Sequence, residues 1–134
     1  MQITRQADYA IRAMLYLARQ GDGVRSATSQ IADEQQIPPS FLAKIISQLS
    51  ISGLIHTSRG AKGGVILAKT PAEISLLDVV EAIDGPINLN VCAHDEKNCP
   101  FGEDCPVQSI WSEAQFNLVN RLKTTTFDQI INKS

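Results

Sequence analysis

The chain has 134 residues, of which 43% are hydrophobic and 19% charged, and this size and composition predict one globular domain. No apolar run approaches the roughly 20 residues that a membrane-spanning helix needs, and the N-terminus has no apolar signal segment, so we expect a cytoplasmic protein without membrane contact. The net charge of −2 is unevenly divided, because residues 1–69 carry eight Lys/Arg and four Asp/Glu whereas residues 70–134 carry four and ten, and only the first half has the positive excess of a nucleic-acid-binding surface.

The first segment predicts an amphipathic helix over residues 3–19. Thr4 is a suitable N-cap, and the glycines that follow the helix end it. Asp8 lies in the first turn, where the helix dipole favours an acid. The apolar side chains recur at helical spacing and predict a buried face made of Ile3, Ala7, Ala10, Ile11, Met14, Leu17 and Ala18.

Two shorter helices are predicted over residues 28–36 and 40–52, with a Pro-Pro turn between them and Gly53 after the second. Such a pair is typical of a helix-turn-helix, in which the second helix enters the major groove of DNA. The second helix has one apolar face, formed by Leu42, Ile45, Ile46 and Leu49. The opposite, polar face and the start of the first helix supply the candidate DNA contacts Ser40, Ala43, Lys44 and Thr28.

A β-hairpin is predicted next, from the apolar segments 54–57 and 65–68 and the glycine-rich turn over residues 59–64. A hairpin after a recognition helix indicates a winged helix-turn-helix, in which Gly60 and its neighbours let the tip approach a phosphate backbone. Arg59 is the candidate for a narrow minor groove and Lys62 for a phosphate. A phosphate-binding loop of an enzyme is disfavoured, because its lysine order and following helix are missing.

The C-terminal half predicts a helix over residues 71–84, with a Ser75–Asp78 capping box and a buried stripe of Leu76, Val79, Val80 and Ile83. A longer helix follows Pro106, and a final short helix is capped by Thr126 and Gln129. The long helix is apolar on more than one side, which predicts a second partner surface and hence a two-fold dimer. Its dimerisation residues are Val107, Ile110, Trp111, Ala114, Leu118 and Leu122.

All three cysteines, Cys92, Cys99 and Cys105, lie in one polar segment between these helices. Burial in the core is disfavoured in a hydrophilic loop, and an odd count in a cytoplasmic protein disfavours disulfides. Metal or cluster ligation is therefore the leading interpretation. A zinc site that includes His94 stays open, although the gaps are longer than those of a zinc knuckle, whereas iron–sulfur clusters accept such gaps. No catalytic arrangement is present, so we do not expect an enzyme.

Taken together, these motifs resemble the IscR/NsrR/RirA family of bacterial iron–sulfur transcription regulators. The resemblance covers nearly the whole chain and is carried by residues 4–18, by the turn Arg-Gly-x-x-Gly-Gly at 59–64 and by the three cysteines. It implies a mainly α fold with a small β-hairpin, divided into a winged helix-turn-helix domain (1–85), a cluster-binding cysteine loop (86–106) and a dimerisation helix with a short last helix (107–134). It also implies a homodimer on a palindromic DNA operator.

The resemblance further distinguishes between two cluster types. IscR-like members carry a histidine three residues after the third cysteine, where this chain has Gln108, which disfavours their [2Fe–2S] ligation. NsrR-like members carry an acid at the position of Asp8, which reaches the cluster of the other chain. The resemblance therefore implies a labile [4Fe–4S] cluster held by three cysteines and Asp8 of the partner subunit, in a repressor that senses iron, nitric oxide or redox state.

Two alternatives stay open at this point. The first is a zinc-bound or thiol-redox regulator with the same winged helix and the same DNA chemistry. The second is a small iron–sulfur electron-transfer protein, which the hairpin and the basic N-terminal half disfavour. Iron, sulfide and zinc analysis separates the first alternative from a cluster sensor.

Overall fold

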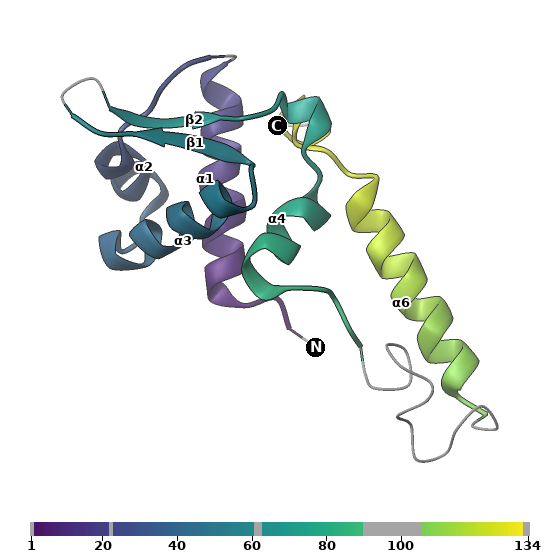
Figure 1. Ribbon diagram of the computed structural model, residues 1–134. Helices are drawn as coiled ribbons and strands as arrows, with labels where there is room; N and C mark the ends of the chain where they lie inside the picture. The colour runs from purple at the N-terminus through teal and green to yellow at the C-terminus, as the bar shows by residue number, and fades with distance from the viewer. Residues whose placement is uncertain (1, 22, 61–62, 90–105, 133–134) are drawn as a thin grey trace.

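The structure is a computed structural model and describes residues 2–21, 23–60, 63–89 and 106–132 (Figure 1). Helices predominate, and the two strands form one antiparallel hairpin, which confirms the predicted fold class. Within these ranges, no helix is both long and apolar enough to span a membrane. The elements are α1 (Arg5–Gln20), α2 (Thr28–Gln35), α3 (Pro39–Ile51), β1 (Ile55–Ser58), β2 (Gly64–Leu67), the 3-10 helix η1 (Pro71–Glu73), α4 (Leu76–Asp84), α6 (Gln108–Lys123) and α7 (Phe127–Asn132).

Helix α1 begins as the N-cap pattern predicts, because the Thr4 hydroxyl accepts a hydrogen bond of 3.1 Å from the backbone N–H of Ala7. The predicted buried face is largely correct. Ile3 is an exception, since it precedes the helix and is exposed, and Ile11 is only half-buried. Tyr16 is buried, although the pattern did not include it.

Helices α2 and α3 are joined by a tight turn that requires an unusual backbone. Gln36 adopts a left-handed conformation with φ 53°, and its N–H is directed to the last carbonyls of α2. The following Ile37 is 2% exposed and fastens the turn to the core. Pro39 is the first residue of α3, one residue before the predicted start, and its missing N–H costs no hydrogen bond there.

The hairpin pairs β1 with β2 in the register Ile55–Leu67, His56–Ile66, Thr57–Val65 and Ser58–Gly64. Ile55 and Val65 are fully buried, whereas His56 is exposed. The hairpin therefore has one face on the core and one face in solvent. The observed strands begin or end one residue away from the predicted ones.

Helix α4 begins with the predicted capping box, in which the Ser75 N–H donates to Asp78 at 3.0 Å and the Asp78 N–H donates to Ser75 at 3.1 Å. Its buried stripe differs from the prediction. Leu77 is buried, whereas Leu76 and Ile83 are only partly so. The reason is that Leu76 and Ile83 contact the main core while Leu77 faces α6, so α4 lies between two apolar clusters.

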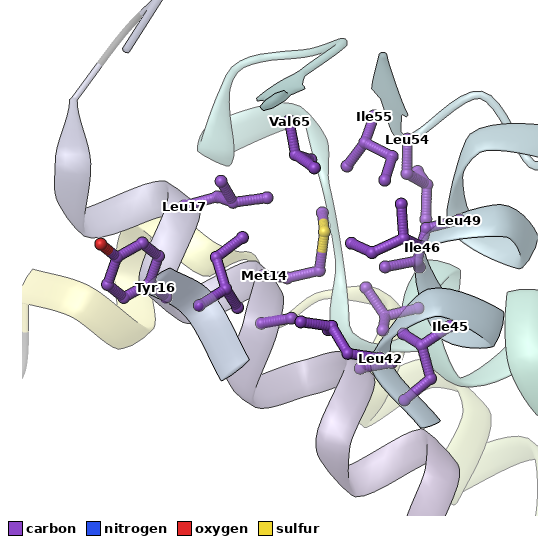
Figure 2. Packing of buried hydrophobic residues seen from close by; sticks show 14 of the residues in the cluster. Met14, Tyr16, Leu17, Leu42, Ile45, Ile46, Leu49, Leu54, Ile55 and Val65 are labelled. Carbon is purple, nitrogen blue, oxygen red and sulfur yellow. The ribbon is translucent and has the colours of Figure 1, made fainter. Parts of the chain in front are cut away.

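The main core joins α1, α2, α3 and the hairpin (Figure 2). Met14 and Leu17 of α1 lie in one cluster with Leu42 and Ile45 of α3 and Val65 of the hairpin. Phe127, the first residue of α7, is 1% exposed and belongs to this same core. The last helix therefore packs on α1, far from it in sequence.

Helix α6 contacts its own chain along only part of its length. Leu118, Val119 and Leu122 pack on Leu77, Val80 and Ile87. None of the residues of α6 is fully buried, and Ile110, Trp111 and Phe116 are 59%, 40% and 69% exposed. Figure 1 shows α6 extending away from the rest of the chain at its N-terminal end. The predicted dimerisation stripe is thus divided, because Leu118 and Leu122 contact α4 while Val107, Ile110, Trp111 and Ala114 are exposed.

The predicted division into segments 1–85, 86–106 and 107–134 remains a prediction. The packing joins the first and third of these segments twice, through the contact of α6 with α4 and through Phe127 in the main core. Two backbone hydrogen bonds also connect these segments. The Leu76 N–H donates to the Thr125 carbonyl at 2.9 Å, and the Phe127 N–H donates to the Ile74 carbonyl at 3.0 Å. The C-terminal end of α6 is therefore fastened to the core.

Candidate nucleic-acid interface

A groove of about 990 Å³ lies between α2, α3 and the hairpin. Four of the predicted DNA contacts line it although they come from three separate elements, namely Thr28, Ala43, Arg59 and Gly60. Thr28 opens α2, Ala43 lies in the second turn of α3, and Arg59 and Gly60 directly follow β1. The tertiary structure thus brings the start of one helix, the recognition helix and the hairpin turn around one depression.

The exposed face of α3 carries the remaining helical candidates. Leu42, Ile45 and Leu49 are buried at 0–1% exposure, so Ser40, Ala43 and Lys44 of the same helix are exposed. Ser40 and Lys44 lie on this face outside the lining of the groove. Because Pro39 sets the first turn of α3, these side chains occupy the end of the helix that contacts bases in helix-turn-helix proteins.

The hairpin turn depends on glycines because backbone atoms pass very close to one another. The Gly63 N–H donates to the Gly60 carbonyl at 2.9 Å, which closes the turn. A Cβ at Gly63 would lie 2.4 Å from the Ser58 carbonyl oxygen, well inside contact distance. Gly60 has φ 96°, a conformation that favours glycine. Lys62 lies outside the described residues, and its predicted phosphate contact stays a prediction.

The groove also contains polar residues that the sequence analysis did not select. Ser29 and Asp33 line its α2 side, and Ser47 and Ser50 its α3 side. Ser47 lies one helical turn after Ala43, so the four-residue spacing from a predicted contact was a usable signal. Asp33 lines the groove together with the cation Arg59, and a carboxylate in a major groove accepts a hydrogen bond from cytosine N4.

Asp8, the predicted cluster ligand, lies on the exposed surface of α1. Its carboxylate forms an ion pair of 3.0 Å with Arg12, one helical turn further on, and the two side chains are 53% and 45% exposed. The Arg12 guanidinium lies 5.5 Å from the centre of the Tyr9 ring. An exposed carboxylate on the first helix is accessible to another protein chain, and an exposed ion pair of this kind contributes at most about 1 kcal/mol.

Cys92, Cys99, Cys105 and His94 lie outside the described residues. Among the residues that the structure does describe, no group of three or more His, Cys, Asp or Glu side chains is placed to hold a metal ion. Both flanks of the cysteine segment are described. On one side the Leu89 N–H donates to Gln115 of α6 at 2.9 Å, and on the other Gln108 is the first residue of α6.

The groove, the exposed face of α3 and the glycine-rich hairpin together define a winged helix-turn-helix protein. The comparisons with known proteins agree. The model of the Rrf2 family, described as an iron-dependent transcriptional regulator, matches residues 3–133. The chain therefore belongs to the Rrf2 family and is a transcriptional regulator, which confirms the predicted class of protein and the prediction that it is not an enzyme.

Individual relatives carry both names that the sequence motifs suggested. The transcriptional regulator NsrR of Shouchella clausii is 33% identical over 132 residues, which cover 98% of this chain and 89% of the relative. IscR of Pectobacterium carotovorum is 29% identical over 98% of this chain and 80% of its own length. These relatives confirm the resemblance to the IscR and NsrR regulators.

Solved structures show the same fold. CymR, the global cysteine regulator of B. subtilis, has a TM-score of 0.82 and 22% identity, covering 100% of this chain and 98% of that one. IscR of T. potens has a TM-score of 0.79 and 22% identity, covering 99% and 88%. The likeness extends over whole chains, so α6 and α7 belong to the shared architecture along with the winged helix.

Proposed function

We propose that this regulator is a homodimeric repressor that senses iron, nitric oxide or redox state through a labile iron–sulfur cluster. The observation that carries the proposal is the position of the two flanks of the cysteine segment, because the Leu89 N–H donates to Gln115 of α6 and α6 itself begins at Gln108. A ligand held by this segment would be adjacent to the helix whose apolar face is exposed. Sensing and assembly would then share one region. A cytoplasmic location stays a prediction.

The exposed part of α6 supports a dimer. Ile110 and Trp111, one helical turn from Val107 and Ala114, form an apolar surface that the described part of the chain does not cover. A second copy related by a two-fold axis would cover this surface with the same surface of its own. The operator would then be palindromic, because each protomer contacts one half-site.

The donor set fits a cluster better than a single metal ion. Three thiolates suit iron–sulfur ligation, and a carboxylate is a harder, weaker fourth ligand. Asp8 of the partner subunit would supply it, since this side chain is exposed and only its ion pair with Arg12 must be exchanged. Gln108, which replaces the histidine of IscR-like members, donates a hydrogen bond to Ser112 at 3.1 Å. We therefore favour [4Fe–4S] over [2Fe–2S].

When bound, such a cluster would supply an iron site with which nitric oxide or oxygen can react and which iron shortage can deplete. The chain's own residues determine the consequence. Asp8 belongs to α1, and α1 packs on α3, whose exposed face carries Ser40, Ala43 and Lys44. If the cluster were lost, Asp8 would no longer be bound to the other protomer, and the distance between the two recognition helices would change. Dimeric DNA-binding proteins depend on this distance, because it must match the spacing of the half-sites.

Analysis of anaerobically purified protein tests the sensor. We expect brown protein with about four iron and four sulfide per chain, as a [4Fe–4S] cluster requires. Replacing Cys92, Cys99 or Cys105 by Ala should abolish stable cluster binding, and Asp8→Ala should shorten its lifetime less, because water can replace an oxygen ligand. Glu81→Ala, an exposed acid on α4, serves as the control. Stoichiometric zinc without sulfide would contradict the proposal.

Binding-site selection tests the DNA-contacting roles. Lys44→Ala should relax the preference at particular base pairs and cost about 1–3 kcal/mol at the preferred site, since lysine donates to guanine O6 and N7. Arg59→Ala should weaken binding mainly where the flanks are A·T-rich. Lys69→Ala, outside the groove, is the matched control. Equal losses on every sequence for Lys44→Ala and Arg59→Ala would show that both residues contact only the backbone.

A second candidate is a thiol-redox regulator with the same DNA interface. The observation that favours it is a structural neighbour, the oxidized form of Staphylococcus aureus CymR, with 25% identity, a TM-score of 0.75 and coverage of 97% of this chain and 95% of that one. In this case the purified protein would contain neither iron nor zinc, and its DNA affinity would change on oxidation of the cysteines. The same metal and sulfide analysis therefore separates the two candidates.

A further inference from the structure

A residue that lies before α2 in the chain pairs with the outer edge of β2. Ser26 forms an antiparallel bridge with Val65, in which the Ser26 N–H donates to Val65 at 2.9 Å and the Val65 N–H donates to Ser26 at 2.7 Å. Figure 1 shows the segment between α1 and α2 passing the hairpin. Val65 is the second residue of β2, so the residues that lead into α2 hold the hairpin near its turn, and Ser26 itself is 4% exposed.

The side chain of Arg25 crosses this small sheet. One of its terminal nitrogens donates to the Ser58 hydroxyl, although Ser58 is on β1 and the strand β2 lies between them. Gly64 of β2 makes the crossing possible. A Cβ at Gly64 would lie 3.0 Å from the Arg25 Cγ and 2.6 Å from the Ser26 carbonyl oxygen. The guanidinium is therefore held next to the residue that precedes Arg59.

The alternation of side chains places Arg25 on the outer face of the hairpin. Val65 is buried against the core, and side chains on neighbouring positions of a strand point to opposite faces. Ser58 pairs with Gly64, the neighbour of Val65, so both belong to the outer face. Ser58 and Gly64 also line the groove that contains Thr28 and Ala43, so the Arg25 guanidinium, which bonds to Ser58, lies beside this groove without lining it.

We infer that Arg25 binds a phosphate of a DNA strand that flanks the minor groove that receives Arg59. This inference rests on the proposed contact of the hairpin turn with that groove. A minor groove is only about 6 Å wide and has phosphates on both edges, so a hairpin tip that enters it meets a strand on each face. Arg25 is bonded to Ser58, the residue before Arg59, and is therefore a cation placed for one of these two strands.

The chemistry of the side chain suits this role. A guanidinium carries five N–H donors and a permanent charge, and the bond to Ser58 uses one donor. Arg25 is exposed, so the other donors are accessible to a phosphate. Ser58 acts as a positioning residue, because its hydroxyl holds the guanidinium beside the turn rather than letting it extend into solvent.

Titrations of an operator duplex at a series of salt concentrations test the inference. Neutralising one phosphate contact should reduce the slope of log affinity against log salt by about 0.9. We expect this change for Arg25→Gln on all sequences alike. Arg25→Lys and Ser58→Ala keep the positive charge and should therefore keep the slope. Ser58→Ala should lose less affinity than Arg25→Gln. Arg121→Gln on α6 is the control for a general change of charge.

Duplexes with a neutral methylphosphonate at single positions identify the phosphate. The wild-type protein should lose affinity when the methylphosphonate is at one particular position beside the minor groove, and Arg25→Gln should lose nothing further there. An unchanged slope for Arg25→Gln, or losses that add at every position, would overturn the inference even if the wild-type protein binds DNA. Absence of salt-dependent binding by the wild-type protein would instead contradict the proposed function. Circular dichroism verifies that each variant is folded.

Discussion

The hydroxyl of Thr4 joins two parts of the chain that are 80 residues apart. It accepts a hydrogen bond of 3.1 Å from the N–H of Ala7 and donates one of 2.6 Å to the carboxylate of Asp84. Asp84 ends α4, where the helix dipole disfavours an acid, but it faces the N-terminus of α1, where the dipole favours one. One hydroxyl therefore caps α1 and fastens it to α4 directly before the cysteine segment.

Thr4→Ala should lower the free energy of unfolding by about 1.5–2 kcal/mol. Loss of an N-cap costs about 1 kcal/mol. The hydrogen bond to a carboxylate adds about 0.5–1 kcal/mol, less than the 1.5–3 kcal/mol of such a bond in general, because this pair is exposed. Urea unfolding at one fixed protein concentration measures the change, since the stability of a dimer depends on concentration.

Thr4→Ser provides the matched control, because it keeps the hydroxyl and should unfold close to the wild-type midpoint. In an Asp84→Ala background, Thr4→Ala should cost only the cap contribution of about 1 kcal/mol, so the two changes should not be additive. If Thr4→Ser destabilises the protein as much as Thr4→Ala, the methyl group and not the hydroxyl stabilises this end of α1. Full additivity would show that the bond to Asp84 contributes nothing.

Three further changes test other parts of the fold. Gln36→Gly should stabilise the protein by about 0.5–1 kcal/mol in urea unfolding, because φ 53° strains a residue that has a side chain. The flexibility of glycine in the unfolded chain cancels only part of the strain that is relieved. A loss of stability would contradict this. Phe127→Ala should cost about 3–5 kcal/mol and release α7, measured as faster amide exchange over α7, since this ring is 1% exposed in the main core. Ile110→Glu should dissociate the dimer in sedimentation, because it would bury a charge in the predicted dimerisation stripe. Phe116→Glu should leave the dimer intact, because Phe116 does not belong to that stripe. Leu118→Glu is a poorer test, since Leu118 also packs on α4.

Short-range signals in the sequence determined most of the secondary structure. Thr4 and the Ser75–Asp78 pair start helices because their side chains satisfy free backbone N–H groups, and Gly53 and Gly85 follow helix ends with positive φ. These signals act within a few residues, so they need no knowledge of the rest of the chain. The same holds for the hairpin, where the glycines after Arg59 permit close backbone contacts that other residues exclude.

The candidate DNA contacts were predicted in part for the same reason. The buried face of α3 follows from the spacing of its apolar residues, and this leaves Ser40, Ala43 and Lys44 exposed. Spacing within one helix does not show which neighbouring elements share a groove, so Asp33 was not among the candidates. Arg25 was missed as well, because its bond to Ser58 crosses β2. This strand lies beside Arg25 only through the pairing of Ser26 with Val65, which is 39 residues later in the chain.

Only the tertiary structure decided how the helices with two apolar sides are used. Leu77 is buried because α6 lies against α4, and Leu118 with Val119 faces this contact while Ile110 does not. The sequence of α6 is compatible with more than one buried face, since helical periodicity ranks the faces but does not identify the surface that covers each of them. Helix α6 is held by its own contact with α4 and by Phe127 in the main core, and both contacts join residues too far apart in the chain for any local pattern to indicate.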